Sequence, residues 1–222
     1  MLEAGPFLLT LKLALITTAI LYVIGIPVAY WLSTSTFKGK IVVEAILSLP
    51  LILPPSVMGF YLLIALSPAN SFGRWIDELL NLRLVFTFHG LILASVVYSL
   101  PFMVQPLLAG FRMLPGSLVE ASYTLGKGRW TTLRRVLLPN IKAAIITGGI
   151  LTFAHTLGEF GVVLMVGGNI PGETRVISVA IYDAVEAMDY GRANLYSGVL
   201  LVFAFALLLG VYLVNYRSLK TT

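Results

Sequence analysis

Five apolar runs, each long enough to cross a membrane, divide this chain of 222 residues. A helix needs about 20 apolar residues to cross roughly 30 Å of hydrocarbon. Hydrophobic residues make up 58% of the chain and charged residues only 11%. This composition lies far outside that of soluble globular proteins and excludes that class. We therefore predict an all-α integral membrane protein with five transmembrane helices, forming one transmembrane domain over the whole chain. The predicted spans are residues 7–32, 41–66, 88–110, 140–166 and 193–216.

The distribution of lysine and arginine predicts the orientation of these spans. Basic residues gather in the cytoplasmic loops of membrane proteins, and this predicts a multi-pass protein with its N-terminus outside and its C-terminus in the cytoplasm. Lys12, near the outer end of the first span, can snorkel to the interface. Because the charge follows the loops of one side, it does not indicate a nucleic-acid partner. The predicted cytoplasmic set is Lys38, Lys40, Arg112, Lys127, Arg129, Arg134, Arg135, Arg217 and Lys220, and the outer set is Arg74, Arg83, Arg175 and Arg192.

The longest polar interruption lies between the third and fourth spans, at about residues 111–139. Ser117 and Glu120 have the S-x-x-E spacing of a capping box, with the serine as the N-cap. This spacing predicts a short helix over about residues 118–125. The segment is therefore expected to fold outside the bilayer.

Glycine and proline punctuate the remainder of this interruption. Gly126 is expected to end the first short helix in the left-handed conformation, which a side chain would resist. A second short helix is expected to begin near Trp130 and to lead to Pro139, a residue suited to the first turn of the next long helix. The expected product is a basic helix–turn–helix.

Prolines interrupt two of the predicted spans. Pro50, Pro54 and Pro55 lie in the second span, and Pro101 and Pro106 lie in the third. Each proline leaves a helical carbonyl without its N–H partner, and such a carbonyl is costly in hydrocarbon unless protein or water lies beside it. A kink repaired by neighbouring helices explains any single proline. Five prolines in two helices favour a water-lined path or a hinge.

A polar stripe runs along one face of the fourth predicted span. Thr152, His155 and Glu159 recur at helical spacing, and ionisable residues within a span usually face a bundle interior or a path. Gly158 and Gly161 allow a close helix approach or a local break beside Glu159. A structural His155–Glu159 pair is an equally good interpretation. No metal site is expected, because these are too few ligands and the chain has no cysteine.

Two further segments have helical periodicity without the character of a span. Residues 71–82 place their apolar side chains on one face, which is typical of an interfacial helix. Residues 175–188 are short and contain Asp183 and Glu186. For this second segment we predict an interfacial or a re-entrant helix.

The polar interruption at residues 111–139 also carries a family resemblance. It resembles the EAA loop of ABC-importer permeases, in which a glycine follows EAA after three residues and I-x-L-P follows after nine more. Serine replaces the last alanine of that pattern, and valine replaces the isoleucine. The resemblance implies a type I ABC importer permease whose coupling helix docks on an ATPase subunit. The matching residues are Glu120, Ala121, Ser122, Gly126, Val136, Leu138 and Pro139.

Three other segments resemble the oxyanion branch of these permeases, most closely the molybdate permeases, with the sulfate permeases as near relatives. They are residues 49–55, 155–161 and 168–175. The resemblance covers nearly the whole chain. It implies a second permease subunit, as in a homodimer, and two copies of an ABC ATPase subunit. It also implies a periplasmic or extracellular oxyanion-binding protein and a bacterial or archaeal cytoplasmic membrane.

We therefore predict the permease subunit of an ATP-driven importer for molybdate or a related oxyanion, with no cofactor and no catalytic residue. The chain lacks the G-x-x-x-x-G-K-[ST] sequence of a P-loop, so a partner chain must hydrolyse ATP. The coupling loop is expected to act through the EAA-loop residues named above. The candidate path or gate residues are Pro50, Pro54, Pro55, Thr152, His155, Gly158, Glu159 and Gly161.

Other functions remain open at this point. The cargo could be tungstate or sulfate. Broken helices also mark ion-coupled secondary transporters, although these commonly show an internal repeat and none is visible here. A membrane-embedded hydrolase would need an activated nucleophile, whereas Glu44 and Glu159 lie in different predicted spans without an evident partner base.

Overall fold

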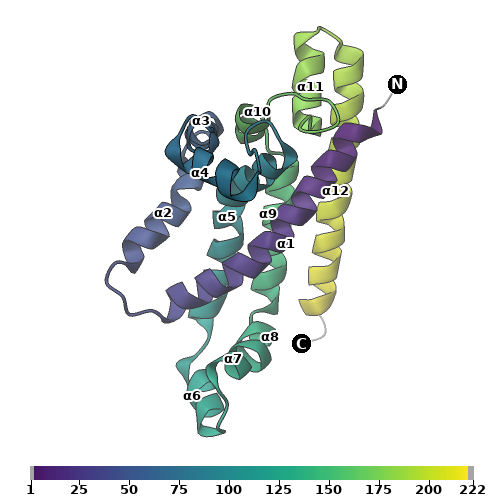
Figure 1. The fold of residues 1–222 in the computed structure, drawn as a ribbon. Helices are drawn as coiled ribbons and strands as arrows, with labels where there is room; N and C mark the ends of the chain where they lie inside the picture. The colour runs from purple at the N-terminus through teal and green to yellow at the C-terminus, as the bar shows by residue number, and fades with distance from the viewer. Residues whose placement is uncertain (1–2, 220–222) are drawn as a thin grey trace.

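The computed structural model describes residues 3–219, and the side chains of all of these except residue 80 and residues 211–219. The described part of the chain is built from helices joined by short connections (Figure 1). Three helices are long and apolar enough to cross a membrane singly, and the number reaches five if each of two bent helix pairs is one span. These three are α1 (Ala4–Thr34), α5 (Phe88–Met113) and, over Tyr190–Gly210, α12 (Tyr190–Leu219). The all-α membrane fold is confirmed, and the count of five spans stays a prediction.

The second predicted span is not one helix. Helix α2 (Lys40–Ile52) and helix α3 (Pro55–Leu66) meet at an angle of 115°. Pro54 caps α3 and Pro55 begins it, so the backbone there lacks two successive N–H donors. The 13 residues of α2 rise only about 20 Å, which is less than the hydrocarbon thickness. The break expected from the prolines of this span is therefore present at residues 53–54, and a crossing of the membrane by residues 41–66 stays a prediction.

The fourth predicted span is also divided. Helix α9 (Lys142–Leu157) and helix α10 (Gly161–Gly167) are separated by residues 158–160. Pro139 lies in the short α8 (Leu138–Asn140), and the chain bends by 77° between α8 and α9. The expectation that Pro139 lies in the first turn of the long helix is therefore wrong, because α9 begins at Lys142, after the bend.

Helices α1, α5 and α9 form the tightly packed centre of the molecule. Gly149 on α9 faces Tyr22 on α1 so closely that a Cβ at Gly149 would lie 1.8 Å from the tyrosine oxygen. That hydroxyl donates a 2.9 Å hydrogen bond to the carbonyl of Ile145. Met103 of α5 is fully buried beside Gly25 of α1. Small residues here let the backbones approach, as is usual between membrane helices.

Polar contacts attach α2 to α5. Gln105 donates a 2.7 Å hydrogen bond to the hydroxyl of Ser48, and Arg112 forms an ion pair with Glu44. Both pairs lie at helical spacing along α2, so they hold one face of this short helix against the centre. Glu44, which had no evident partner in the sequence, is thus paired to a basic side chain.

The connecting segments gather at two opposite ends of the molecule (Figure 1). Helices α6 (Gly116–Thr124), α7 (Arg129–Thr132) and α8 lie at the end where α12 finishes. Helix α11 (Ile177–Glu186) lies at the other end, beside the first turns of α12. Helix α4 (Ser71–Leu80) follows α3 and is capped by Asn70, which accepts a hydrogen bond from the backbone of Phe72. The helices predicted within residues 71–82 and 175–188 are both present. Their depth in a bilayer stays a prediction.

The orientation also stays a prediction, and single cysteines test it well because the chain has none of its own. Glu173 lies in the loop before α11 and Lys127 lies between α6 and α7, and both are exposed. These helices lie at opposite ends of the molecule (Figure 1). We expect Glu173→Cys to react with a membrane-impermeant thiol reagent in intact cells, and Lys127→Cys to react only after the membrane is opened. The reverse pattern would contradict an outside N-terminus. Lys220 and the side chain of Arg217, which entered the charge comparison, lie outside the described parts.

Candidate functional site

The two helix breaks lie against each other. A Cβ on Gly161, at the start of α10, would lie 2.8 Å from the Cβ of Pro55, at the start of α3. Gly59, one turn further along α3, comes equally close to Met165 of α10. Only glycine permits these approaches, because a Cβ would collide with the neighbouring helix. The structure thereby brings together two helix breaks that are about 100 residues apart in the sequence.

An open groove of about 620 Å³ lies over this junction. Its polar lining consists of hydroxyl groups, one imidazole and one carboxyl group, and no lysine or arginine takes part. The groove therefore offers hydrogen-bonding groups beside apolar walls, without a lysine or arginine. The lining residues are Pro55, Ser56, Tyr98, Ala154, His155, Gly158, Glu159, Phe160 and Gly161.

Glu159 lies in the break between α9 and α10 and is only 4% exposed. Its Oε2 accepts a 2.8 Å hydrogen bond from Ser95 of α5, while its Oε1 has no partner among the described residues. Its backbone carbonyl accepts a 2.6 Å hydrogen bond from Ser178 of α11. Glu159 therefore links the break to two other helices, and it does so without a basic partner.

His155 does not pair with Glu159. Its Nδ1 shares a 2.9 Å hydrogen bond with the hydroxyl of Ser99, and its ring stacks on Phe102 with the centroids 3.9 Å apart. The i, i+4 argument requires the helix to continue through both residues. Helix α9 ends at Leu157, so Glu159 leaves the face that carries His155. The hypothesis of a mutual pair is therefore wrong, and α5 supplies the partners of both side chains.

The remaining path candidates do not line the groove. Thr152 is buried, and its hydroxyl has no hydrogen-bond partner among the described residues. Pro50 is buried within α2. Pro54 comes directly before Pro55, the first residue of α3 that lines the groove. Sequence reasoning also missed Ser95 and Ser99, whose i, i+4 spacing in an apolar span was the available signal. No three metal-binding side chains lie together within residues 3–219.

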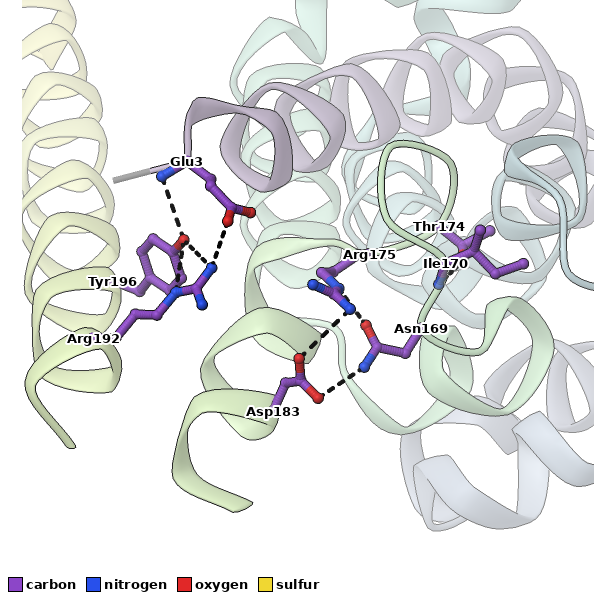
Figure 2. A network of polar contacts seen from close by, with 8 residues as sticks. All are labelled: Glu3, Asn169, Ile170, Thr174, Arg175, Asp183, Arg192 and Tyr196. Atoms are coloured by element: carbon purple, nitrogen blue, oxygen red, sulfur yellow. Dashed lines mark hydrogen bonds and ion pairs between the residues drawn. The ribbon is translucent and has the colours of Figure 1, made fainter. Parts of the chain in front are cut away.

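The loop that follows α10 is held to α11 by a closed polar network (Figure 2). Arg175 donates to the side-chain oxygen of Asn169, and Asn169 donates a 3.0 Å hydrogen bond to Asp183 of α11. Arg175 also forms an ion pair with Asp183 at 3.6 Å. Since Ser178 on the same helix binds the carbonyl of Glu159, hydrogen bonds connect this end of the molecule to the helix break.

A second network in Figure 2 fixes the start of α1. Arg192, in the first turn of α12, forms an ion pair with Glu3 at 2.7 Å, and its guanidinium lies over the ring of Tyr196. Tyr196 is fully buried. The first and last long helices are therefore tied together at the same end as α11.

The basic loop at the opposite end forms a helical hairpin. Helix α6 (Gly116–Thr124) is closed by Gly126, which has a φ of +69°. The N–H of Gly126 donates to the carbonyl of Tyr123, and the N–H of Lys127 donates to that of Ser122. These two bonds form a Schellman motif. The left-handed glycine expected from the sequence is confirmed.

The predicted capping box is absent from this hairpin. Helix α6 begins one residue before Ser117, with Pro115 at the N-cap, and no side chain caps it. Ser117 therefore lies inside the first turn, where its hydroxyl cannot bond the N–H that an N-cap would reach. The glutamate of the pattern, Glu120, is exposed on α6, where it is accessible to a partner.

The return arm of the hairpin is less regular than expected. It consists of α7 (Arg129–Thr132), the π-helical turn η1 (Leu133–Leu137) and α8. A buried 2.8 Å hydrogen bond between Ser122 and Thr132 joins it to α6. A groove of about 270 Å³ lies between the arms, with an apolar floor and two basic residues. It is lined by Leu118, Ala121, Ser122, Leu125, Lys127, Thr131, Arg135 and Val136.

The chain matches a known protein family over most of its length. The family model for binding-protein-dependent transport system inner membrane components matches residues 10–217. The chain belongs to this family. It is a multi-pass membrane permease, and the hairpin and the groove are therefore features of a transport subunit.

Several relatives of this permease have assigned cargoes. The molybdenum transport system permease protein ModB of Azotobacter vinelandii is 47% identical over 92% of this chain and 90% of that protein. ModB of Escherichia coli (strain K12) is 35% identical over 83% of this chain and 80% of that protein. A probable sulfate transport system permease protein, cysT of Chlorella vulgaris, is 35% identical over 94% of this chain and 78% of that protein.

The fold of the permease is also that of a solved transporter. A bacterial ABC transporter involved in the import of the acidic polysaccharide alginate matches 99% of this chain and 81% of its own, with a TM-score of 0.71 and 19% sequence identity. At this identity the similarity concerns the fold alone. The type I permease architecture is thereby confirmed.

Proposed function

We propose that this permease carries molybdate across the cytoplasmic membrane as a subunit of an ATP-driven importer. The observation that carries the proposal is the 47% identity to a molybdenum permease over nearly the full length of both chains. The matched sulfate permease is less similar, at 35%. Sulfate and tungstate are the alternative cargoes, and an ion-coupled secondary transporter is a more distant alternative.

The groove over the two helix breaks is the proposed gate. A doubly charged oxyanion crossing a membrane needs hydrogen-bond donors, but a deep basic site would hold it too long for transport. Ser56, Tyr98 and His155 line the groove and can supply hydrogen bonds, and no lysine or arginine lines it. Non-helical backbone within a membrane is tolerated where it lines a cavity, and the two breaks reach the groove at Pro55 and at Glu159.

The hairpin of α6 to α8 is the proposed docking element for an ABC ATPase subunit. Glu120, Ala121 and the groove between the arms are accessible there. Gly126 makes the left-handed turn between the arms. Leu138 and Pro139 connect this element to the bend before α9. A movement of the docked hairpin would thus reach the helix that leads to Glu159.

The remaining partners follow from the same proposal. A second copy of the permease would complete the path, because few helices here are long enough to enclose one. Two ATPase subunits would dock at the hairpin end, and an oxyanion-binding protein would dock at the end formed by α11 and the network of Figure 2. This arrangement places the hairpin in the cytoplasm and the start of α1 outside.

Uptake of labelled molybdate tests the proposed cargo. The complete importer should be expressed in cells that lack their own molybdate uptake, with an ATPase-inactive importer as the control. We expect saturable uptake that needs ATP and is not reduced by a large excess of sulfate. Equal competition by sulfate would assign the permease to sulfate instead. Uptake that continues with the inactive ATPase would indicate a secondary transporter.

A further inference from the structure

A second groove, of about 270 Å³, lies between the last turns of α1 and the beginning of α7. It shares no residue with the groove between the arms of the hairpin. Its floor is apolar, and a single charged side chain stands at its edge. The lining residues are Pro27, Tyr30, Trp31, Arg129, Trp130 and Leu133.

Arg129 is held in this groove by an aromatic ring. Its guanidinium carbon lies 5.2 Å from the centroid of the Tyr30 ring, within the range of a cation–π contact. Tyr30 is itself buried and packs against Phe111. No acidic side chain within residues 3–219 pairs with the guanidinium of Arg129.

Two exposed tryptophans flank Arg129. Trp31 is 42% exposed and Trp130 is 72% exposed, which is costly for large apolar side chains in water. Tryptophan is enriched where membrane proteins cross the boundary between hydrocarbon and headgroups. Trp31 lies in the last turns of α1, a helix long enough to cross a membrane, so the groove is located at one boundary of the bilayer.

We propose that this groove binds the headgroup of an anionic phospholipid. The planar guanidinium of Arg129 offers paired N–H donors that match the oxygens of a phosphate group. Trp31 and Trp130 line the space that the glycerol and the upper acyl chains would occupy. Basic grooves between membrane helices on the cytoplasmic side suit such lipids, and Arg129 belongs to the more basic side of this chain.

Charge and position favour a lipid over a protein in this groove. One unpaired cation surrounded by apolar and aromatic groups complements a lipid with one phosphate and two chains. The groove that contains Lys127 and Arg135 lies between the two arms of the hairpin. It therefore stays accessible to the proposed ATPase subunit when the lipid groove is filled. The two surfaces can therefore be occupied at the same time.

Tryptophan fluorescence tests the lipid site, because the chain has only three tryptophans. The complete importer carrying Trp75→Phe is reconstituted in phosphatidylcholine vesicles, so that Trp31 and Trp130 are the only tryptophans of the permease. Brominated phosphatidylglycerol or brominated phosphatidylcholine is then added in increasing mole fraction. A sample with Trp31 and Trp130 also replaced by phenylalanine supplies the background from the partner chains. We expect the anionic lipid to quench at a mole fraction about fivefold lower, as for one basic side chain beside an anionic surface.

The variant that decides the proposal is Arg129→Gln, which should remove the preference for the anionic lipid. The matched control is Arg134→Gln, since Arg134 is exposed nearby but does not line the groove, and it should keep the preference. Equal quenching by both lipids, or a preference that survives Arg129→Gln, would overturn the proposal. Absence of quenching by either lipid would also overturn it, because a protein would then cover the groove. The assay does not depend on which anion is transported.

Discussion

Glutamine in place of Glu159 is expected to retain most molybdate uptake, whereas alanine is expected to abolish it. The side chain is buried, has no basic partner and accepts a hydrogen bond from Ser95. Glu159→Gln keeps the size of the side chain and an acceptor for Ser95, and it places no charge in an apolar site. Glu159→Ala removes the acceptor and leaves a cavity, which together cost about 2–5 kcal/mol.

This expectation treats Glu159 as a link between helices and not as a ligand of the anion. A carboxylate on the path would repel an oxyanion, whereas a hydrogen bond to α5 and a carbonyl bonded to Ser178 of α11 hold the break in place. Loss of that link should reduce both the amount of assembled importer and its transport. Uptake must therefore be measured at matched membrane abundance of each variant.

Thr152→Val is the matched control for this pair. Thr152 is as deeply buried on α9, but its hydroxyl has no hydrogen-bond partner in the part of the chain that the structure describes. Its removal therefore leaves no other polar group unsatisfied. We expect normal uptake in this variant. If Glu159→Gln and Glu159→Ala both abolish uptake while the complex stays intact, a charge at this position is required in the transport cycle and the linking role is wrong.

Gly126→Val is expected to leave the permease in the membrane but to uncouple it from the ATPase. The residue has a φ of +69°, a conformation that costs a side chain about 1–2 kcal/mol and a β-branched one more. Relief of that strain would break the Schellman bonds and change the angle between the arms of the hairpin. Since each 1.4 kcal/mol is a factor of about ten in an equilibrium, we expect uptake and stimulated ATP hydrolysis to fall by about tenfold.

Gly128→Val separates this strain from a general effect of bulk. Gly128 is two residues away and equally exposed, a Cβ there meets nothing within 4 Å, and its φ of −73° suits any residue. Gly128→Val should transport nearly normally. Equal loss at both glycines would mean that the surface itself, and not the left-handed turn, matters for docking. Normal transport in Gly126→Val would remove the turn from the coupling mechanism.

Features that depend on one segment of the chain were predictable. The long helices α1, α5 and α12 follow from long apolar runs, and the left-handed turn at Gly126 follows from a glycine after a short helix. The expected interruption at Pro101 and Pro106 is wrong, because α5 continues through both prolines. The capping box failed because an S-x-x-E pattern does not state where the helix begins, and Pro115 is the N-cap, two residues earlier than expected.

Features that depend on several segments required the tertiary structure. Glycines and prolines in the sequence of this permease marked where helices can break, since those residues alter the backbone wherever they stand. Whether the breaks meet was decided by the packing of Gly161 on Pro55, which no local pattern encodes. The end of α9 at Leu157 then turned Glu159 away from His155 and toward Ser95. Hydrophobic length and backbone preference are local properties of a chain, whereas the partner of a buried polar group is chosen by whichever helices pack around it.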